Sequence, residues 1–347
     1  MTTSPAADRQ YLLVANPAAQ SGRAQGMIDG ALVDMRLRRM QVELMYTEPT
    51  GTAARVRDRL NGGDVDVVVY LGGDGTFHEV AIGILEADER VPLGMLPAGT
   101  ANDQGLSFGI RRGEIERNVD VIVAGHVTML DVGSVARRDH RRVTIEESYF
   151  FDSCGWGIHP DILATRNRHQ RVAGRIPLLK HLYRGKAIYV TASLAKLLES
   201  YVEPVKFACE VKADGVVREL RGMTDVVISA TPIYAGHWVL DRHSEPDDGK
   251  FELVPFQGRR DWASKTLRDL AASPVWQEQL DRLGLRHAEG FSASEFELDF
   301  YRPEKGELCC QVDGEEWGTG DSYRIRAIPR ALPLLTPADF VPPWKPR

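Results

Sequence analysis

Residues 65–79 read VDVVVYLGGDGTFHE, and this stretch decides the fold of the first part of the chain. Val65–Leu71 is a nearly continuous run of β-branched and apolar residues, as expected for a parallel strand that is covered on both faces. The glycine-rich turn that follows leads into a helix predicted from about Phe77 to Ala87, and Pro92–Leu96 predicts the next strand. A buried strand, a glycine turn, a helix and another strand in this order predict a parallel sheet with helices on both faces.

The same alternation of strand and helix precedes this stretch. Two apolar strand-like runs each lead into residues spaced as on one face of a helix. These predicted elements are Tyr11–Ala15, Ser21–Arg39, Val42–Tyr46 and Thr52–Leu60. Because 347 residues exceed the usual length of one domain, we predict two domains, the first an α/β domain over residues 1–124.

Beyond about Ala124 the pattern changes to short strands joined by turns. Two helical insertions interrupt them, around Ile176–Leu198 and Trp262–Leu283. The predicted strands are Thr128–Ala136, Tyr149–Ser153, Val205–Lys212, Asp225–Ser229, Phe251–Pro255, Glu295–Tyr301 and Leu308–Val312. This pattern predicts an antiparallel β-sandwich over residues 125–327.

Composition narrows the class of protein. Hydrophobic residues make up 43% and charged residues 27% of the chain, as in ordinary globular proteins, and the net charge of −6 argues against general nucleic-acid binding. The four cysteines show no C-x-x-C spacing, which favours reduced thiols over disulfides or zinc. No apolar stretch reaches the length of a membrane helix, and Met1–Gln10 lacks the apolar region of a signal peptide. We expect a cytoplasmic protein whose membrane contact, if any, is peripheral.

The glycine-rich turn carries the strongest functional signal. Three glycines around Asp74 remove side chains where phosphate groups approach the backbone, and the following helix directs its first amides there. Asp74 in such a turn can hold Mg²⁺ or orient a reacting hydroxyl. The turn is not a Walker A loop, because no Lys-Ser/Thr pair follows. The alternative is a tight turn in which Asp74 caps the helix.

Two further loops of small and polar residues follow predicted strands. They are Asn16–Arg23 and Leu96–Asp103. Since ligands bind at the carboxyl ends of parallel strands, three such loops at strand ends predict a nucleotide-binding cleft. Two later segments, Pro246–Leu253 and Gln311–Glu315, are by themselves ordinary turns.

Together, the five segments resemble the lipid kinase family of diacylglycerol and sphingosine kinases. The resemblance runs from about Tyr11 to Thr336 and rests on GGDGT-F-H-E-V, P-A-G-T-A-N-D and the late D-G-E. It implies an N-terminal phosphofructokinase-like α/β domain and a C-terminal β-sandwich, with ATP in the cleft between them. It also implies that residues 328–347 return to the first domain.

The resemblance implies roles for individual residues. Glu315 would accept the proton of the lipid hydroxyl, with Asp74 close by at the phosphates, and Asp248, Glu245 and the carbonyl of Lys250 would hold Mg²⁺. The residues expected at ATP are Asn16, Ser21, Gly22, Thr47, Gly73, Asp74, Gly75, Thr76, Phe77, His78, Glu79, Gly99, Thr100 and Asn102. Phosphoryl transfer needs mainly positioning and neutralisation of charge, which suits backbone amides and a metal ion.

Several positions depart from the family pattern. An aromatic residue and an arginine are common where this chain has Gln104 and Leu106, and asparagine is common at Asp152. A glycine is common at Gln20 and a histidine at Thr52. These departures bear on lipid choice and turnover.

Residues 162–198 concentrate positive charge in an acidic protein. The stretch contains eight Lys or Arg residues and, up to Leu198, no Asp or Glu. One interpretation is a solvated helix face. The other is a patch that includes Arg168, Arg171 and Arg175 and docks on anionic lipid.

The leading hypothesis is therefore an ATP- and Mg²⁺-dependent kinase that converts diacylglycerol to phosphatidic acid at a membrane surface. A sphingoid-base or ceramide kinase shares the scaffold, and a non-catalytic nucleotide- or lipid-binding relative is the alternative from another class. NAD kinase and phosphofructokinase also use a G-G-D-G loop, but neither explains the late D-G-E. Edge strands of the second domain leave a homodimer open.

Overall fold

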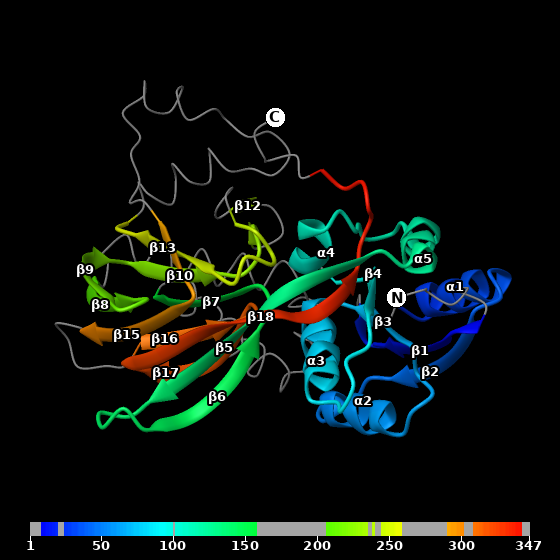
Figure 1. Cartoon of the computed structure of the whole chain (residues 1–347), viewed down its shortest axis with the longest axis horizontal. Coiled ribbons are helices and arrows are strands. Elements are labelled where there is room, and N and C mark those ends of the chain that lie inside the picture. The colour runs from blue at the N-terminus through cyan, green and yellow to red at the C-terminus, as the bar shows by residue number, and fades with distance from the viewer. Residues whose placement is uncertain are drawn as a thin grey trace, which may run out of the picture.

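The computed structural model describes residues 8–19, 24–99, 101–157, 206–234, 238–239, 244–258, 290–301 and 308–341. The predicted helices within residues 176–198 and 262–283 lie outside these ranges, as do Ser21, Gly22, Thr100, Arg168, Arg171 and Arg175. Within the described ranges the chain forms an α/β half and a β-sandwich half, which lie side by side in Figure 1.

The α/β half alternates strands and helices as the sequence predicts. Its elements are β1 (Gln10–Ala15), α1 (Ala24–Leu37), β2 (Gln41–Tyr46), α2 (Thr52–Asn61), β3 (Val67–Gly72), α3 (Asp74–Leu85), β4 (Leu93–Pro97), α4 (Asp103–Ser107) and α5 (Ile115–Ala124). The strands lie in the order β2-β1-β3-β4, and all three pairings are parallel. Every residue of β3 is buried, as the β-branched run requires for a central strand with helices on both faces.

The sandwich half is antiparallel. Its strands are β5 (Val127–Arg138), β6 (Thr144–Phe150), β7 (Ser153–Gly157), β8 (Phe207–Ala213), β9 (Val216–Met223), β10 (Asp225–Ser229), β11 (Ile233–Tyr234), β12 (Trp238–Val239), β13 (Phe251–Phe256), β14 (Phe291–Ala293), β15 (Glu295–Tyr301), β16 (Leu308–Val312), β17 (Glu315–Gly320) and β18 (Ser322–Leu335). One sheet has the order β14-β13-β10-β7-β16-β17. The facing sheet contains β6, β5, β18, β15, β8 and β9.

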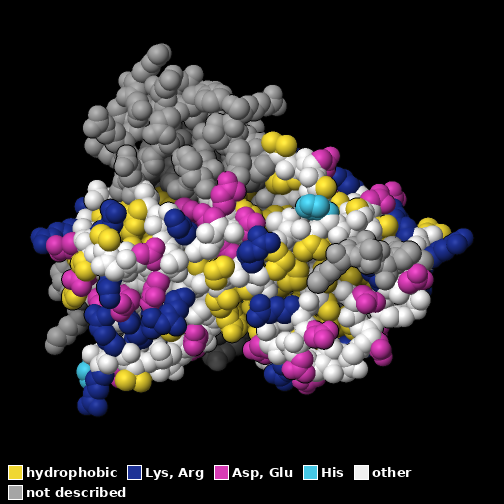
Figure 2. All heavy atoms as spheres, viewed as in Figure 1, with side chains coloured by type: hydrophobic (Ala, Val, Ile, Leu, Met, Phe, Trp, Pro, Cys, Tyr) yellow, Lys and Arg dark blue, Asp and Glu magenta, His cyan; other side chains and the backbone are white. Residues whose placement is uncertain are grey.

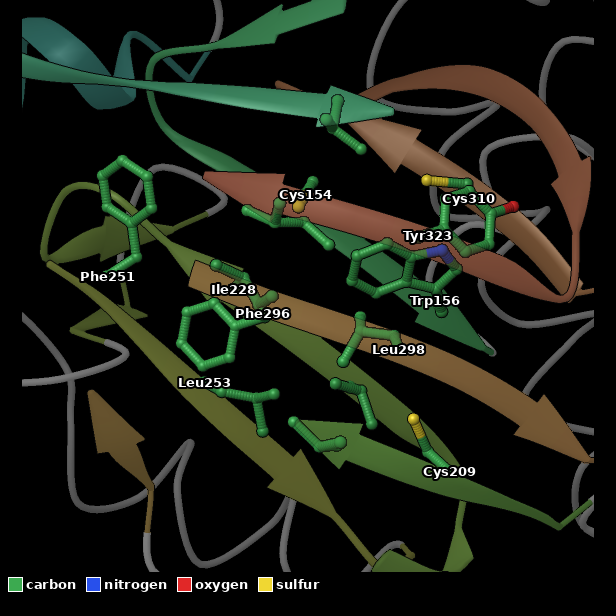
Figure 3. Close-up of a cluster of buried hydrophobic side chains, with 14 of the residues drawn as sticks. Cys154, Trp156, Cys209, Ile228, Phe251, Leu253, Phe296, Leu298, Cys310 and Tyr323 are labelled. Atoms are coloured by element: carbon green, nitrogen blue, oxygen red, sulfur yellow. The ribbon is translucent and has the colours of Figure 1, made fainter. Parts of the chain in front are cut away.

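Apolar side chains from the two sheets form the core of the sandwich. Figure 3 shows Trp156 and Tyr323 directed toward one another, and their ring centroids are 5.1 Å apart in an edge-on contact. Cys154 and Cys310 lie in the same cluster, fully buried. All four cysteines are free thiols, which confirms the prediction from their spacing.

The long strand β18 joins the two halves. It pairs antiparallel with β5 and β15 in the sandwich half and parallel with β4 through Leu334 and Leu93. One sheet of ten strands therefore runs through the described parts of both halves (Figure 1). A second core cluster packs Phe77 and Val80 of α3 against Leu332 of β18, so the halves are packed together.

The strand predicted at Tyr149–Ser153 is wrong in detail. The chain turns at Phe151 and Asp152 and forms two strands, β6 and β7, that lie in different sheets. The physical reason is a carboxylate: Asp313 accepts hydrogen bonds from successive backbone amides of this turn, which cannot then pair in a ladder. The helix α3 also begins at Asp74, three residues before the predicted start at Phe77.

Candidate active site

Three loops at the carboxyl ends of β1, β3 and β4 lie against one another. The backbone N–H of Asn16 donates to the carbonyl of Leu71 at 2.9 Å, and the N–H of Ala98 donates to the carbonyl of Gly72 at 2.6 Å. The side-chain amide of Asn16 also donates to Thr76 Oγ1 at 3.3 Å. The parallel register thus brings the described parts of the predicted nucleotide loops to one edge of the sheet.

The glycines allow these loops to touch. A Cβ on Gly99 would lie 2.5 Å from the Cα of Gly73, and a Cβ on Gly72 would lie 2.3 Å from Thr76 Oγ1. A Cβ on Gly75 would meet nothing within 4 Å. Gly72, Gly73 and Gly99 are therefore required by the packing of the loops, whereas Gly75 leaves open space at the first turn of α3.

Asp74 holds the neighbouring loop in place. Its carboxylate accepts hydrogen bonds from the backbone amides of Asn102 at 2.9 Å and Asp103 at 3.0 Å. Asn102 adopts a left-handed conformation with φ of 57°, and its side chain closes the loop by hydrogen bonds to both the amide and the carbonyl of Gly99. Burial raises the pKa of Asp74, and the two amides partly offset this rise. The structure thus gives Asp74 a definite task, which is to fix the loop between β4 and α4.

The remaining residues predicted to contact ATP have different surroundings. Glu79 accepts a hydrogen bond from the amide of Ala53 at 3.1 Å and so ties α3 to the start of α2. The side chain of Phe77 is fully buried and packs edge-on against Tyr70 and Phe151. The amide of Thr47 donates to the carbonyl at the end of β1 at 2.9 Å. Thr47 therefore lies at the same strand ends, while the Phe77 side chain belongs to the core.

His78 reaches from α3 to the sandwich half. Its Nδ1 lies 2.7 Å from Oδ2 of Asp313, which stands in the turn between β16 and β17. Asp313 has a φ of 46° and accepts hydrogen bonds from the amides of Phe151, Asp152 and Ser153 at 2.8 to 3.1 Å. The predicted proton acceptor, Glu315, is exposed at the start of β17, two residues beyond Asp313. The late D-G-E segment and the glycine-rich loop helix thus lie in the same region, and their catalytic roles stay predictions.

A cluster of carboxylates surrounds this contact. Asp152 accepts a hydrogen bond from Thr231 Oγ1 at 2.6 Å and from Ser153 Oγ at 3.3 Å. Burial raises the pKa of Asp152 well above its usual value, and the charges of Asp103, Asp313 and Asp74 raise it further. A protonated Asp152 is neutral and has nearly the same shape as asparagine, with an acceptor oxygen and a donor group, so the departure from the family pattern at this position is chemically small.

Sequence reasoning missed Asp313 and the effect of its neighbours on Asp152. The D-G pair in Gln311–Glu315 is an ordinary turn signal, and the sequence does not show that the Asp carboxylate would bind a turn more than 150 residues upstream. In the structure Asp313 has a left-handed φ of 46°, but this gives little indication of a special role, because aspartate adopts that conformation more readily than most residues.

The predicted metal site lies in the turn before β13, where aspartate side chains accept hydrogen bonds from backbone amides. Asp248 Oδ1 accepts a hydrogen bond from the amide of Lys250 at 2.9 Å. Asp131 is fully buried and binds the amides of Gly249 and Arg330 at 2.5 and 2.6 Å. Among the described residues, no group of three or more His, Cys, Asp or Glu side chains is placed to hold a metal ion. The predicted ligands are two carboxylates, Asp248 and Glu245, and the carbonyl of Lys250, so they do not form a group of this kind. The magnesium site therefore stays a prediction.

Glu245 lies at a separate cavity of about 240 Å³. The cavity opens where α4, the start of β5 and the end of β18 meet. Its polar lining includes His126, Thr128 and Ser244, and the hydroxyls of Thr128 and Thr336 are 2.6 Å apart. Glu245 thus lines this cavity as well as preceding the Asp248 turn.

The first part of the chain is similar to known kinases in sequence. Residues 10–135 match the model of the diacylglycerol kinase catalytic domain. A diacylglycerol kinase of Staphylococcus aureus is 32% identical over 126 residues, and one of Staphylococcus epidermidis is 31% identical over 126 residues. Each match covers 36% of this chain and 40% of the relative, so the chain aligns with less than half of the length of these curated proteins.

The likeness in fold extends over nearly the whole chain. A crystal structure of a diacylglycerol kinase from Bacillus anthracis has a TM-score of 0.67 at 16% identity and covers 96% of this chain and 98% of that one. A yeast NADH kinase in complex with NADH has a TM-score of 0.51 at 10% identity, with 95% and 84% of the two chains covered. At these identities the likeness establishes the fold, and it confirms an α/β domain followed by a β-sandwich domain.

Proposed function

We propose, from the match of residues 10–135 to the model of the diacylglycerol kinase catalytic domain, that the chain is an ATP-dependent lipid kinase. The proposed reaction converts diacylglycerol to phosphatidic acid. The lipid hydroxyl oxygen forms a bond to the γ-phosphorus of ATP, the bond from that phosphorus to the bridging oxygen breaks, and ADP leaves. The proton of the hydroxyl passes to a carboxylate of the protein.

The observation that carries this proposal is the placement of the glycine-rich loop opposite the late D-G-E turn. The contact between His78 and Asp313 joins residues 235 positions apart in the chain. One side of this contact carries the glycine-rich loop, where we place the phosphates, and the other side carries carboxylates. A kinase needs both, because transfer depends on holding the phosphates and the acceptor hydroxyl in line.

The phosphate side fits ATP. The amide of Gly75 lies in the first turn of α3 and therefore has no acceptor within the helix. The space at Gly75 is open, and the helix of 12 residues directs its positive end there. Asn16 and Thr76 line the same edge, joined by their side-chain hydrogen bond. ATP supplies the phosphoryl group, and these residues bind and orient it.

The acceptor side provides the base. Glu315 is exposed, at the start of β17, and its charge acts on His78, so it lies near the proposed transfer point. We propose that Glu315 is the base that accepts the proton of the lipid hydroxyl. Asp313 cannot move to that task freely, because three backbone amides and His78 hold it.

The lipid and the metal complete the proposal. Mg²⁺ accompanies ATP as the counter-ion of its phosphates, and a second ion at Asp248 and Glu245 would brace the turn before β13. The described residues include no helix that is long and apolar enough to cross a membrane. We propose that the protein reaches its lipid by peripheral contact with the membrane surface, through the basic residues Arg168, Arg171 and Arg175.

The test is phosphoryl transfer from labelled ATP, with Mg²⁺, to a panel of dispersed lipids. We expect labelled phosphatidic acid from diacylglycerol, and little product from sphingosine or ceramide. Product from either of these instead would reassign the substrate. Binding of ATP without transfer to any lipid would contradict the kinase and favour a non-catalytic relative.

A further inference from the structure

His78 stands one helical turn after the start of the phosphate loop helix. Residues four apart lie on the same face of a helix, so His78 shares a face with Asp74, about 6 Å along the axis. Side chains in a helix lean toward its amino end, which directs the imidazole of His78 back toward the glycine loop. No Lys or Arg occurs in residues 71–79, so His78 is the single basic side chain of this motif.

The imidazole is held in one orientation. Asp313 Oδ2 engages Nδ1 at 2.7 Å, and three backbone amides hold Asp313 in turn. The ring of Phe151 packs edge-on against the imidazole, with centroids 5.5 Å apart. Since Nδ1 is committed to Asp313, the nitrogen left for a ligand is Nε2.

The surroundings of His78 are acidic. Asp313 and Glu315 face it from the sandwich half, and Glu79 is its neighbour in α3. Burial alone lowers the pKa of His78, but the hydrogen bond that its imidazole donates to Asp313 and the charges of these three carboxylates more than offset burial and raise the pKa. A neutral side chain at position 78 would leave the carboxylates uncompensated where phosphate must enter.

We propose that His78 is a catalytic residue whose imidazolium, fixed through Nδ1 by Asp313, donates from Nε2 to an oxygen of the phosphoryl group in transfer. This role rests on the proposed lipid kinase function and deepens it. The cation neutralises charge on the phosphoryl oxygens, where a Walker A loop would use lysine. It also offsets the negative charges of Asp313 and Glu315, which would otherwise repel the phosphate.

The variants separate the charge of His78 from its structural contact. His78→Asn places an amide nitrogen where Nδ1 lies, so it can still donate to Asp313, but it has no Nε2 and no charge. His78→Gln reaches the Nε2 position without charge. His140→Asn makes the same change on an exposed histidine of the β5–β6 turn and serves as the matched control.

The first measurement is kcat against pH with saturating ATP and diacylglycerol. We expect the kcat of the parent to fall as pH rises through the pKa of His78, because the cation is lost. His78→Asn should reduce kcat by about 10²-fold, the scale of one lost donor to a developing charge, and kcat should then no longer fall through this pH range. His78→Gln should recover part of the rate, also without the fall at higher pH. His140→Asn should match the parent. If the kcat of the parent instead rises with pH through the pKa of His78, then His78 acts as a base, and the proposal that its protonated form donates to the phosphoryl group is wrong.

The second measurement does not need a lipid. NMR of histidine labelled with ¹⁵N should show His78 titrating above 6.5 in the parent and at lower pH in Asp313→Asn. Addition of ATP should shift the His78 signals and move the ³¹P signal of the γ-phosphate, and the ³¹P change should be absent in His78→Asn. If the parent phosphorylates no lipid, the proposed function fails, and this experiment still decides the role of His78 at the phosphate. His78 signals that ignore ATP would overturn the inference.

Discussion

The carboxylate of Asp74 accepts a hydrogen bond from the backbone amide of Asn102 at 2.9 Å. The aspartate of the glycine-rich loop after β3 therefore fixes the conformation of the loop after β4. Asn102 is in the left-handed region of backbone conformation, which costs free energy and persists only because the surrounding contacts hold the residue there. The two loops are therefore one unit, and a change in Asp74 must reach both.

We predict that Asp74→Asn reduces kcat by about 10²-fold in the proposed reaction, since a misplaced loop no longer holds the phosphates in line. The asparagine offers one acceptor oxygen where the carboxylate serves two amides, at Asn102 and Asp103. The melting temperature should fall slightly as well. Asp88→Asn, an exposed aspartate just after α3, is the control and should match the parent in both measurements. Full activity and an unchanged melting curve in Asp74→Asn would contradict this role.

The contrast between Asp74 and β3 shows what the sequence can predict. The β-branched run of β3 and the glycine turn after it have local causes, so their positions followed from residues 65–79 alone. The partners of Asp74 and His78 depend on how distant segments pack. His78 meets Asp313 only because β16 and β17 return beside α3, and no local pattern encodes that approach.

Long-range pairing explains the other differences in the same way. The turn at Asp152 reads as part of one strand, since Tyr149 to Ser153 is mostly apolar and aromatic. It becomes a turn because Asp313 binds its amides from another strand pair. The 14-residue strand β18 was also not predicted from the sequence, because Pro329 and Pro333 interrupt the alternation of residues that is typical of a strand. Strand β18 accommodates Pro329 with a shift in register between Ile328 and Leu332, and Pro333 lies opposite Met129 of β5.

Gly83 tests the packing that positions α3. A Cβ at Gly83 would lie 2.7 Å from the carbonyl oxygen of Ala53 and 2.7 Å from Cβ of Val56, both in α2. We predict that Gly83→Ala destabilises the protein by about 1–3 kcal/mol, since α2 must shift to make room. The measurement is the free energy of unfolding in urea.

Gly30→Ala is the matched control for Gly83→Ala. Gly30 also lies within a helix, α1, but it is exposed and a Cβ there would meet nothing within 4 Å. Removing a helical glycine should stabilise the protein by about 0.5–1 kcal/mol. Equal effects of the two substitutions would contradict the close contact between α2 and α3.

Glu297 anchors a network of charges on the outer face of the sandwich half. Its carboxylate accepts hydrogen bonds from Arg138 and Lys212 at 2.9 Å, and these hold its pKa at about 2, compared with 4.5 for an unperturbed glutamate. Arg138 is 8% exposed, so loss of this partner would leave a buried guanidinium without its carboxylate. Figure 2 shows acidic and basic side chains intermixed on the sandwich half.

We predict that this network stabilises the protein above pH 4.5 and that the stabilisation is lost as pH falls from 4.5 through 2. The folded-state pKa is below the unfolded one, so protons bind preferentially to the unfolded chain. Glu297→Gln should cost about 2 kcal/mol at pH 7 after allowance for solvent screening, and this cost should shrink toward pH 2. Glu219→Gln removes an exposed pair with Arg221 and should change little. Urea unfolding at pH 7, 4 and 3 measures both, and a cost for Glu297→Gln that does not vary with pH would contradict the assignment.

Asp152 should have the opposite pH dependence, because its pKa is raised. It is 6% exposed, and Asp103, Asp313 and Asp74 surround it, so the folded state favours the protonated acid. The stability that this preference provides is complete below the unfolded pKa of about 3.9 and is lost as pH rises through the folded pKa.

We predict that Asp152→Asn stabilises the protein at pH 8 relative to the parent and that the gain shrinks toward pH 4. Asparagine can accept the hydrogen bond from Thr231 Oγ1 with its oxygen, and its amide can donate to Ser153 Oγ, the hydroxyl that donates to Asp152 in the parent. The substitution leaves no carboxylate that must be kept neutral. Asp214→Asn is the control of opposite sign. Although burial raises the pKa of Asp214, hydrogen bonds from Ser294 and Glu295 lower it, so its removal should destabilise the protein at pH 8 and less at pH 4. Urea unfolding of both variants at the two pH values is the measurement, and a destabilised Asp152→Asn at pH 8 would show that the carboxylate is charged in the folded protein.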